Sequence, residues 1–261
     1  MPHHGPSLSD SASVIARLDA ESRRFIASTA ARRASLELKG ASAFTAVTQA
    51  LIELRADLRI VELSARAIAE EIDHSGIYLA FARAYSTDDV PAPRPEPIDL
   101  PVYPGVGDDG QRLLRAIGMC SINETMACSF LELCLEGATV APIREGLRCV
   151  LEDEVRHARI GWACLGSPLV GDAERRLVSD WLMPMLRAQW QGWSDQIATL
   201  PEGERAEHGC PSAGAIERAS RASVLDLVLP GFARAGVDVS RATAWFERAA
   251  EPPTIVARDR T

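Results

Sequence analysis

The sequence predicts an all-α protein, on two observations. Aromatic residues make up only 5% of the 261 residues, and no run of alternating β-branched residues marks a strand, whereas residues with a high helix propensity are abundant. Apolar residues recur every three or four positions, the spacing that gives a helix one buried face. Most of the chain is therefore expected to fold as helices packed against one another.

The first half is expected to form an N-terminal helix and two long helices. Residues 1–8 are expected to be a disordered tail, and residues 9–29 form the first helical stretch. Residues 31–55 and 60–85 follow, each with apolar residues at helical spacing. Asp57 lies where a side chain can cap the second of these long helices.

A proline-rich segment, residues 86–107, interrupts the helices in mid-chain. It holds six of the sixteen prolines, and such a chain is extended at roughly 3.1 Å per residue. It can span roughly 65 Å, more than a helix of about 25–30 residues. We therefore expect one long crossover, after which the next helix begins at the opposite end of the bundle.

The second half is expected to complete a four-helix bundle and then to flank it. Helices are predicted at 109–136 and from Pro142 to about 165, because proline suits the first turn of a helix. A turn at 137–139 joins them. Further helices are expected at 172–199, 214–229 and 240–250, with a loop at 200–213. The expected parts are 1–30 (tail and helix), 31–165 (bundle) and 166–261 (C-terminal helical extension).

Charge and cysteine usage narrow the classes of function. A net charge of −8 argues against a nucleic-acid partner. No apolar run reaches the roughly 18 residues of a membrane span, and the N-terminus lacks the apolar core of a signal peptide. A cytoplasmic protein without a membrane partner is expected. The six cysteines form no Cys-x-x-Cys pair, so we expect buried thiols and no rubredoxin-type iron site.

Two strings of the form Glu-x-x-His carry the clearest functional signal. One comprises Glu71 and His74, and the other comprises Glu154 and His157. Residues three apart share one helix face, with Cβ atoms about 5–6 Å apart. A single such string is most often a solvated surface pair. A functional site is indicated here because the string occurs twice and each copy is in register with a further glutamate.

Those two glutamates stand at matching depths on the partner helices. Glu37 precedes Glu71 by 34 residues, and Glu124 precedes Glu154 by 30. The midpoints, positions 54 and 139, fall beside or inside the expected turns. In an antiparallel pair, residues equidistant from the turn lie level, so each helix pair directs two glutamates and one histidine to a common depth.

Four carboxylates inside a bundle need cations, because unpaired buried charges are costly in free energy. Carboxylate and imidazole ligands suit iron and tolerate manganese, whereas six ligands for two ions exceed what a closed zinc site needs. The sequence therefore predicts two bound iron ions, with manganese as the alternative. The expected ligands are Glu37, Glu71, His74, Glu124, Glu154 and His157.

These strings resemble the ligand set of the ferritin-like diiron carboxylate superfamily, which includes ferritins, rubrerythrin-type proteins, ribonucleotide reductase small subunits, hydroxylases and arylamine N-oxygenases. The resemblance covers about residues 31–165, and Asp-Glu-Val-Arg-His at 153–157 is similar to the superfamily string Asp-Glu-x-Arg-His. It implies a ferritin-like bundle with one long crossover. The layout also resembles stand-alone bacterial ferritin-like domain proteins.

The resemblance implies roles for residues beside the ligands. The superfamily aspartate typically bonds a ligand histidine from the other half of the bundle, which pairs Asp153 with His74. Arg156 would neutralise nearby carboxylates, with a surface ion pair as the alternative for it and for Asp153. Glu70 replaces the corresponding aspartate of the first string and would support His157.

Other positions carry weaker expectations. Asp73 stands where the second string has its arginine, and Val150 stands where N-oxygenase relatives carry an extra histidine. Tyr78, one turn beyond His74, is expected in the core, with a supporting or radical-forming role as the alternative. His208 lies in a polar stretch and is expected to be exposed.

The resemblance implies two alternative functions. The first is an O2-dependent oxidase or oxygenase that hydroxylates, desaturates or N-oxidises a small organic substrate. It would need a separate reductase or ferredoxin, because nothing in the chain binds flavin or NAD. The second is an iron-binding or ferroxidase protein without an organic substrate, and a substrate-sized apolar pocket beside the metals distinguishes the two. The tryptophan-bearing C-terminal helices offer a surface for a homodimer.

Overall fold

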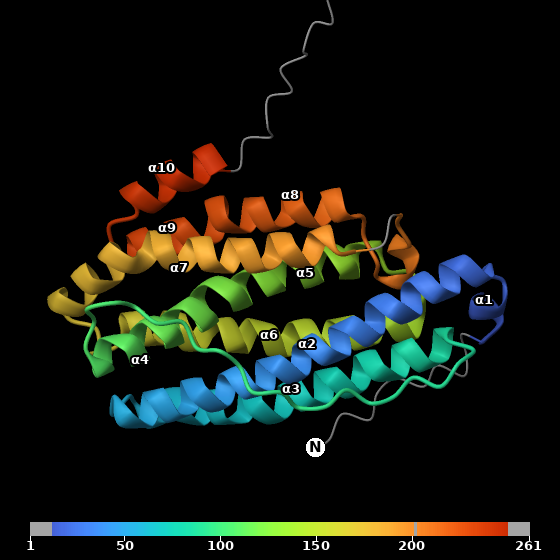
Figure 1. Ribbon diagram of the computed structural model, residues 1–261, viewed down its shortest axis with the longest axis horizontal. Helices are drawn as coiled ribbons and strands as arrows, with labels where there is room; N and C mark the ends of the chain where they lie inside the picture. The colour runs from blue at the N-terminus through green and yellow to red at the C-terminus, as the bar shows by residue number, and fades with distance from the viewer. Residues whose placement is uncertain (1–11, 201–202, 250–261) are drawn as a thin grey trace, which may run out of the picture.

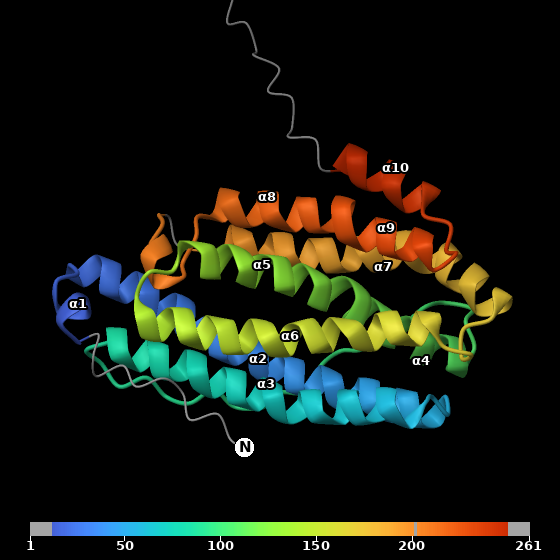
Figure 2. The same cartoon turned by 180° about the vertical axis from the view of Figure 1, so that it is seen from behind.

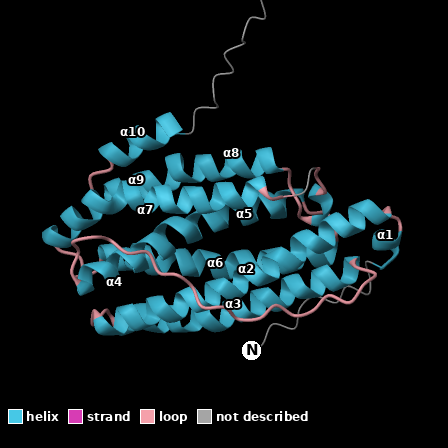
Figure 3. Ribbon diagram, viewed as in Figure 1, coloured by secondary structure: helices cyan, strands magenta, loops and turns pink. Residues whose placement is uncertain are grey.

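The computed structural model describes residues 12–200 and 203–249, and over these ranges it is helical without a strand (Figure 3). The all-α prediction is confirmed there. The tail at 1–8, expected to be disordered, lies outside the described residues. None of the described helices combines the length and the apolar character that a bilayer crossing requires.

Two pairs of long helices pack side by side in the molecule (Figures 1 and 2). In the first pair, α2 (Ala20–Glu53) packs along α3 (Leu58–Tyr85). The second pair joins α6 (Ala141–Gly166) to a helix that changes type twice, and α3 packs against α6. The segments of that helix are α4 (Asp108–Ile117), the π-helical η2 (Gly118–Asn123) and α5 (Glu124–Gly137).

The segment 86–107 connects the two pairs without forming a helix. It leaves the end of α3 and runs the length of the molecule beside α2 and α3 before α4 begins at the opposite end (Figure 1). Ser42 of α2 donates a hydrogen bond of 2.9 Å to the carbonyl of Glu96, which holds the loop against the helix. The loop therefore forms one wall over the middle of α2.

The break expected between helices at 9–29 and 31–55 is absent. The short α1 (Ala12–Ala16) ends first, and α2 then runs unbroken through the expected boundary. The residues around position 30 are alanines and other helix-tolerant residues, so nothing there ends a helix. Asp19 caps α2 by accepting a 2.7 Å hydrogen bond from the Ser22 N–H.

The single helix expected at 109–136 contains the π-helical turn η2 directly before Glu124. Helix α6 approaches this turn very closely at Gly161, where an added Cβ would lie 2.6 Å from the backbone nitrogen of Ser121. Only glycine permits that approach. A π-turn inserted in an α-helix is frequent at functional sites.

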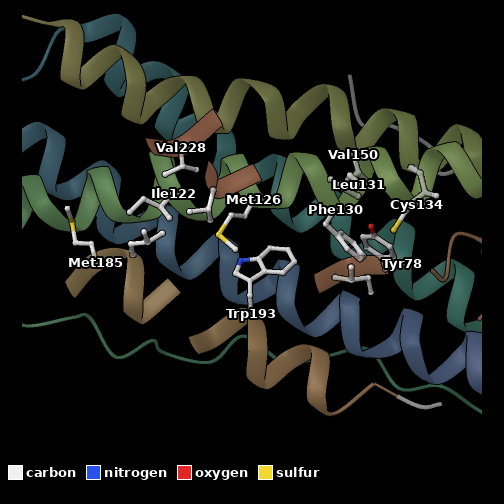
Figure 4. Close-up of a cluster of buried hydrophobic side chains, with 14 of the residues drawn as sticks. Tyr78, Ile122, Met126, Phe130, Leu131, Cys134, Val150, Met185, Trp193 and Val228 are labelled. Carbon is white, nitrogen blue, oxygen red and sulfur yellow. The ribbon is translucent and has the colours of Figure 1, made fainter. Parts of the chain in front are cut away.

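The C-terminal helices form a layer over the second pair (Figure 1). Here α7 packs against α4 and η2, and α8 packs against α5. Trp193 of α7 lies beside Met126 and Phe130 of α5 in the hydrophobic core (Figure 4). The helices are α7 (Asp172–Ala198), α8 (Ala213–Ser223), the π-helical η4 (Val224–Val228), α9 (Leu229–Arg234) and α10 (Ser240–Ala249).

The expected helix at 214–229 continues past its predicted end to Arg234. Pro230 lies in the first turn of α9 and has no N–H to donate, and the π-helical η4 directly before it accommodates the missing helical hydrogen bond. The last helix was expected at 240–250 and is described up to Ala249.

Candidate metal centre

The structure brings all six predicted ligands to one place, from four elements. Five of them are buried, with exposed fractions between 0% and 3%, and only Glu37 is partly exposed. Because four helical segments each contribute to the cluster, the packing of both helix pairs fixes its geometry. The residues are Glu37 on α2, Glu71 and His74 on α3, Glu124 on α5, and Glu154 and His157 on α6.

The six side chains form two overlapping groups that could each hold a metal ion. Within each group, one ligand atom from every residue lies within 4.8 Å of the others. Glu71 and Glu154 belong to both groups, so these carboxylates lie where they can bridge two ions. The first group is Glu37, Glu71, His74 and Glu154, and the second is Glu71, Glu124, Glu154 and His157.

The two histidines direct the same ring nitrogen into the cluster. The Nε2 of His74 lies 3.1 Å from Asp153 Oδ2, and the Nε2 of His157 lies 2.9 Å from Glu70 Oε2. A carboxylate that accepts the Nε2–H fixes the tautomer and leaves a lone pair on Nδ1. Both Nδ1 atoms therefore face the carboxylates as potential metal ligands.

The Nδ1 of His74 is the clearest sign that this cluster suits a cation. This buried atom has no hydrogen-bond partner in the part of the chain that is described. Its nearest carboxylate oxygens belong to Glu154 at 3.4 Å, Glu37 at 3.8 Å and Glu71 at 4.0 Å. Buried polar atoms are nearly always satisfied, and a metal ion between these groups would satisfy this one. The residues present thus fit a metal site.

The electrostatics of these side chains also suit a metal site. Burial and the neighbouring Glu154 carboxylate raise the pKa of Glu71 to about 8. Burial, with Glu154 and Glu71 nearby, raises the pKa of Glu124 well above its usual range. Burial alone would lower the pKa of His157, but its hydrogen bonds with carboxylates raise it to about 12. The raised pKa values mean that these buried carboxylates repel one another. Either bound protons or a bound cation must offset their negative charge.

A second set of charges surrounds the histidines. Arg156 donates a 2.9 Å hydrogen bond to Glu70 and forms an ion pair with Asp153. As expected from the sequence, Asp153 contacts His74 and Glu70 contacts His157. Arg66 donates a 2.6 Å hydrogen bond to Glu70. The sequence analysis did not predict this contact, although a spacing of four residues in a helix favours such an ion pair. Burial would raise the pKa of Glu70, but His157 and the arginines lower it to about 2.

Asn123 and Trp193 are further contacts that the sequence analysis missed. The side-chain amide of Asn123 donates a 3.2 Å hydrogen bond to Glu124 Oε1. The indole N–H of Trp193 donates a 3.1 Å hydrogen bond to Asn123 Oδ1. Helix α7 is thereby linked to a predicted ligand, and no sequence signal pairs a tryptophan with an asparagine 70 positions away.

Tyr78 and His208 are the two remaining positions with a prediction from the sequence. Tyr78 is buried, its hydroxyl has no hydrogen-bond partner among the described residues, and its ring packs edge-on against Phe81. The prediction of an exposed His208 is wrong, because a 2.6 Å hydrogen bond joins its Nδ1 to the Tyr85 hydroxyl and the ring is buried. The short 3-10 turn Ala206–His208 folds this polar stretch back onto the helices.

A cavity of about 280 Å³ opens directly onto the cluster, with the carboxylate ligands in its wall. A second cavity of about 560 Å³ adjoins it between α2, α4 and the crossover loop. Ala43, Ile98, Met119 and Gln189 line both cavities, so the two meet at these residues. The wall of the larger cavity is mixed. Aliphatic side chains of α2 and the crossover loop form one part of it, and charged side chains form another, namely Glu53, Asp99, Asp108, Arg112 and Arg115.

Compared with known proteins, the chain matches no family model, no curated protein and no solved structure.

Proposed function

We propose that the protein is a non-haem diiron enzyme that uses O2 to oxidise a small organic substrate. The observation that carries this proposal is the pair of overlapping ligand groups, which share Glu71 and Glu154 and open onto a cavity. The two helix pairs joined by one long crossing loop support a ferritin-like four-helix bundle as the scaffold. The same fold can host several chemistries, so the proposed reaction is based on the residues of the site.

Iron suits this donor set because four carboxylates and two imidazoles are ligands that Fe(II) accepts with open positions, and manganese is the second choice. When bound, the two ions would supply the redox chemistry with O2, and a separate reductase or ferredoxin would supply electrons. The protein contributes position and exclusion of water. Asp153 and Glu70 orient the two imidazoles, and burial keeps solvent from five of the six ligands.

The cavities favour an enzyme over an iron-binding or ferroxidase protein. Pockets for small molecules commonly have volumes of about 300–1,000 Å³ and apolar walls. The larger cavity, at about 560 Å³, falls in that range and reaches the cluster through the smaller one. Oxidation of iron alone needs no such space, so the cavity supports an organic substrate.

Iron loading under anaerobic conditions tests the proposal. We expect about two irons per chain, and admission of O2 should then produce near-ultraviolet absorption of oxidised iron. Glu71→Ala should abolish binding of both ions, whereas Glu62→Ala, an exposed glutamate on the same helix, should bind as the wild type does. A folded wild-type protein that takes up no iron would refute both the enzyme and the iron-binding alternative.

A further inference from the structure

The cavity beside the cluster contains a cation that forms no ion pair with any residue that the structure describes. Arg33 of α2 lines this cavity, and its guanidinium carbon lies 3.7 Å from the ring centroid of Phe130 and 6.0 Å from that of Trp193. Within the described part of the chain, Arg33 forms no ion pair and donates no hydrogen bond. Stacking occupies the face of the guanidinium and leaves the N–H groups on its edge free.

The charges around Arg33 are matched elsewhere. On the proposed function, two divalent ions balance the four carboxylate ligands. Beyond them, Glu70 and Asp153 are paired with arginines. Lys39, the other cation of this cavity, lies 3.9 Å from Glu96. Among the described residues, Arg33 is therefore left as a partly buried positive charge without an ion pair, so an anion that enters the cavity can pair with it.

The order of residues along α2 shows how such an anion would lie. Arg33 precedes the predicted ligand Glu37 by one helical turn, about 6 Å along the axis. Ala43, at the junction of the two cavities, and Val47, in the wall of the larger one, follow on the same helix. A molecule bound from end to end would thus meet the cation first, then the metal cluster, and then the aliphatic side chains of α2 in the wall of the larger cavity.

We propose that the site binds an organic acid whose carboxylate pairs with Arg33 and whose apolar chain passes the metal cluster toward the cavity between α2, α4 and the crossover loop. The oxidation of this acid rests on the proposed function, whereas its binding depends on the contact between its carboxylate and Arg33. It names the class of substrate as carboxylic acids with an apolar body. Guanidinium and carboxylate groups match in planar, two-pronged hydrogen bonding.

The test is binding of decanoate, with decanamide as its uncharged analogue, measured by calorimetry without O2. Both the iron-loaded and the metal-free full-length protein are used. Arg33→Met keeps an apolar side chain against Phe130, and we expect it to weaken decanoate binding at least about tenfold while decanamide binding is unchanged. Iron content per chain in this variant should equal that of the wild type.

Arg32→Met is the matched control, because Arg32 is the neighbouring residue, bonds Thr199 and does not line this cavity. It should bind decanoate as the wild type does. Equal binding of decanoate and decanamide, undiminished binding to Arg33→Met, or no decanoate binding would each overturn the proposal. Iron uptake is counted separately: a chain that binds decanoate through Arg33 but takes up no iron would refute the proposed function and leave the acid site standing.

Discussion

Gly40 of α2 should be required for the metal centre but not for the fold. A Cβ added at this position would lie 2.5 Å from Glu71 Oε2 and 2.7 Å from its Cδ, about 0.9 and 0.7 Å closer than an ordinary contact of about 3.4 Å. The atoms in conflict are the end of a flexible side chain, so the carboxylate should move rather than the helices. Metal–ligand distances tolerate only about 0.2 Å, and Glu71 belongs to both ligand groups.

We therefore expect Gly40→Ala to weaken Fe(II) binding at least about 10–100-fold, the range found for residues that merely support ligands. The metal-free variant should nevertheless be more stable by about 0.5–1 kcal/mol, because alanine replaces glycine inside a helix. Competition with a chelator measures the first quantity, and urea unfolding measures the second.

Gly76→Ala is the control for this experiment. Gly76 lies on α3 two residues beyond His74, is exposed, and has nothing within 4 Å of an added Cβ. It should give the same gain in stability without loss of iron binding. Two irons bound to Gly40→Ala with wild-type affinity would refute the reasoning, and a loss of metal-free stability would show that the helices had moved instead.

Three further outcomes are expected. Asp153→Ala should weaken iron binding about 10–100-fold in chelator competition, because His74 loses the acceptor that orients its ring; unchanged affinity would deny that role. Tyr85→Phe should lower the free energy of unfolding by about 1–3 kcal/mol, since His208 Nδ1 is left buried without a partner, and its iron content should not change. Chelation should lower the wild-type free energy of unfolding by about 2.7 kcal/mol for each bound ion, or about 5 kcal/mol for two, relative to protein with free metal at about 100 times Kd; equal urea midpoints would show that the folded state binds no metal in preference to the unfolded state.

The gathering of the six predicted ligands could be anticipated because it depends on local geometry. A helix rises by a constant amount per residue, so spacing from a short turn fixes the depth of Glu37 against Glu71 and of Glu124 against Glu154. Three-residue spacing then places each histidine beside its glutamate. These relations need no knowledge of distant contacts, and neither does the all-helical character of the chain.

Other features depend on contacts between residues far apart in sequence. The π-helical turn before Glu124 lies where Gly161 of α6 approaches it closely. The residues of the turn itself do not predict a π-helix. His208 stands among polar residues, but its burial depends on Tyr85, 123 positions earlier. The stacked position of Arg33 likewise needs Phe130 of α5 and Trp193 of α7.

Helix α7 contributes to the wall of the cavity through Gln189, Trp193 and Gln196, yet none of the predicted ligands lies on it. Substitutions on α7 can thus reshape what enters the cavity while the metal ligands stay as they are. The hydrogen bond from Trp193 to Asn123 is the exception, because it ties α7 to Glu124. A laboratory-evolution library that varies positions 189 and 196 but keeps Trp193 should change substrate preference without loss of iron.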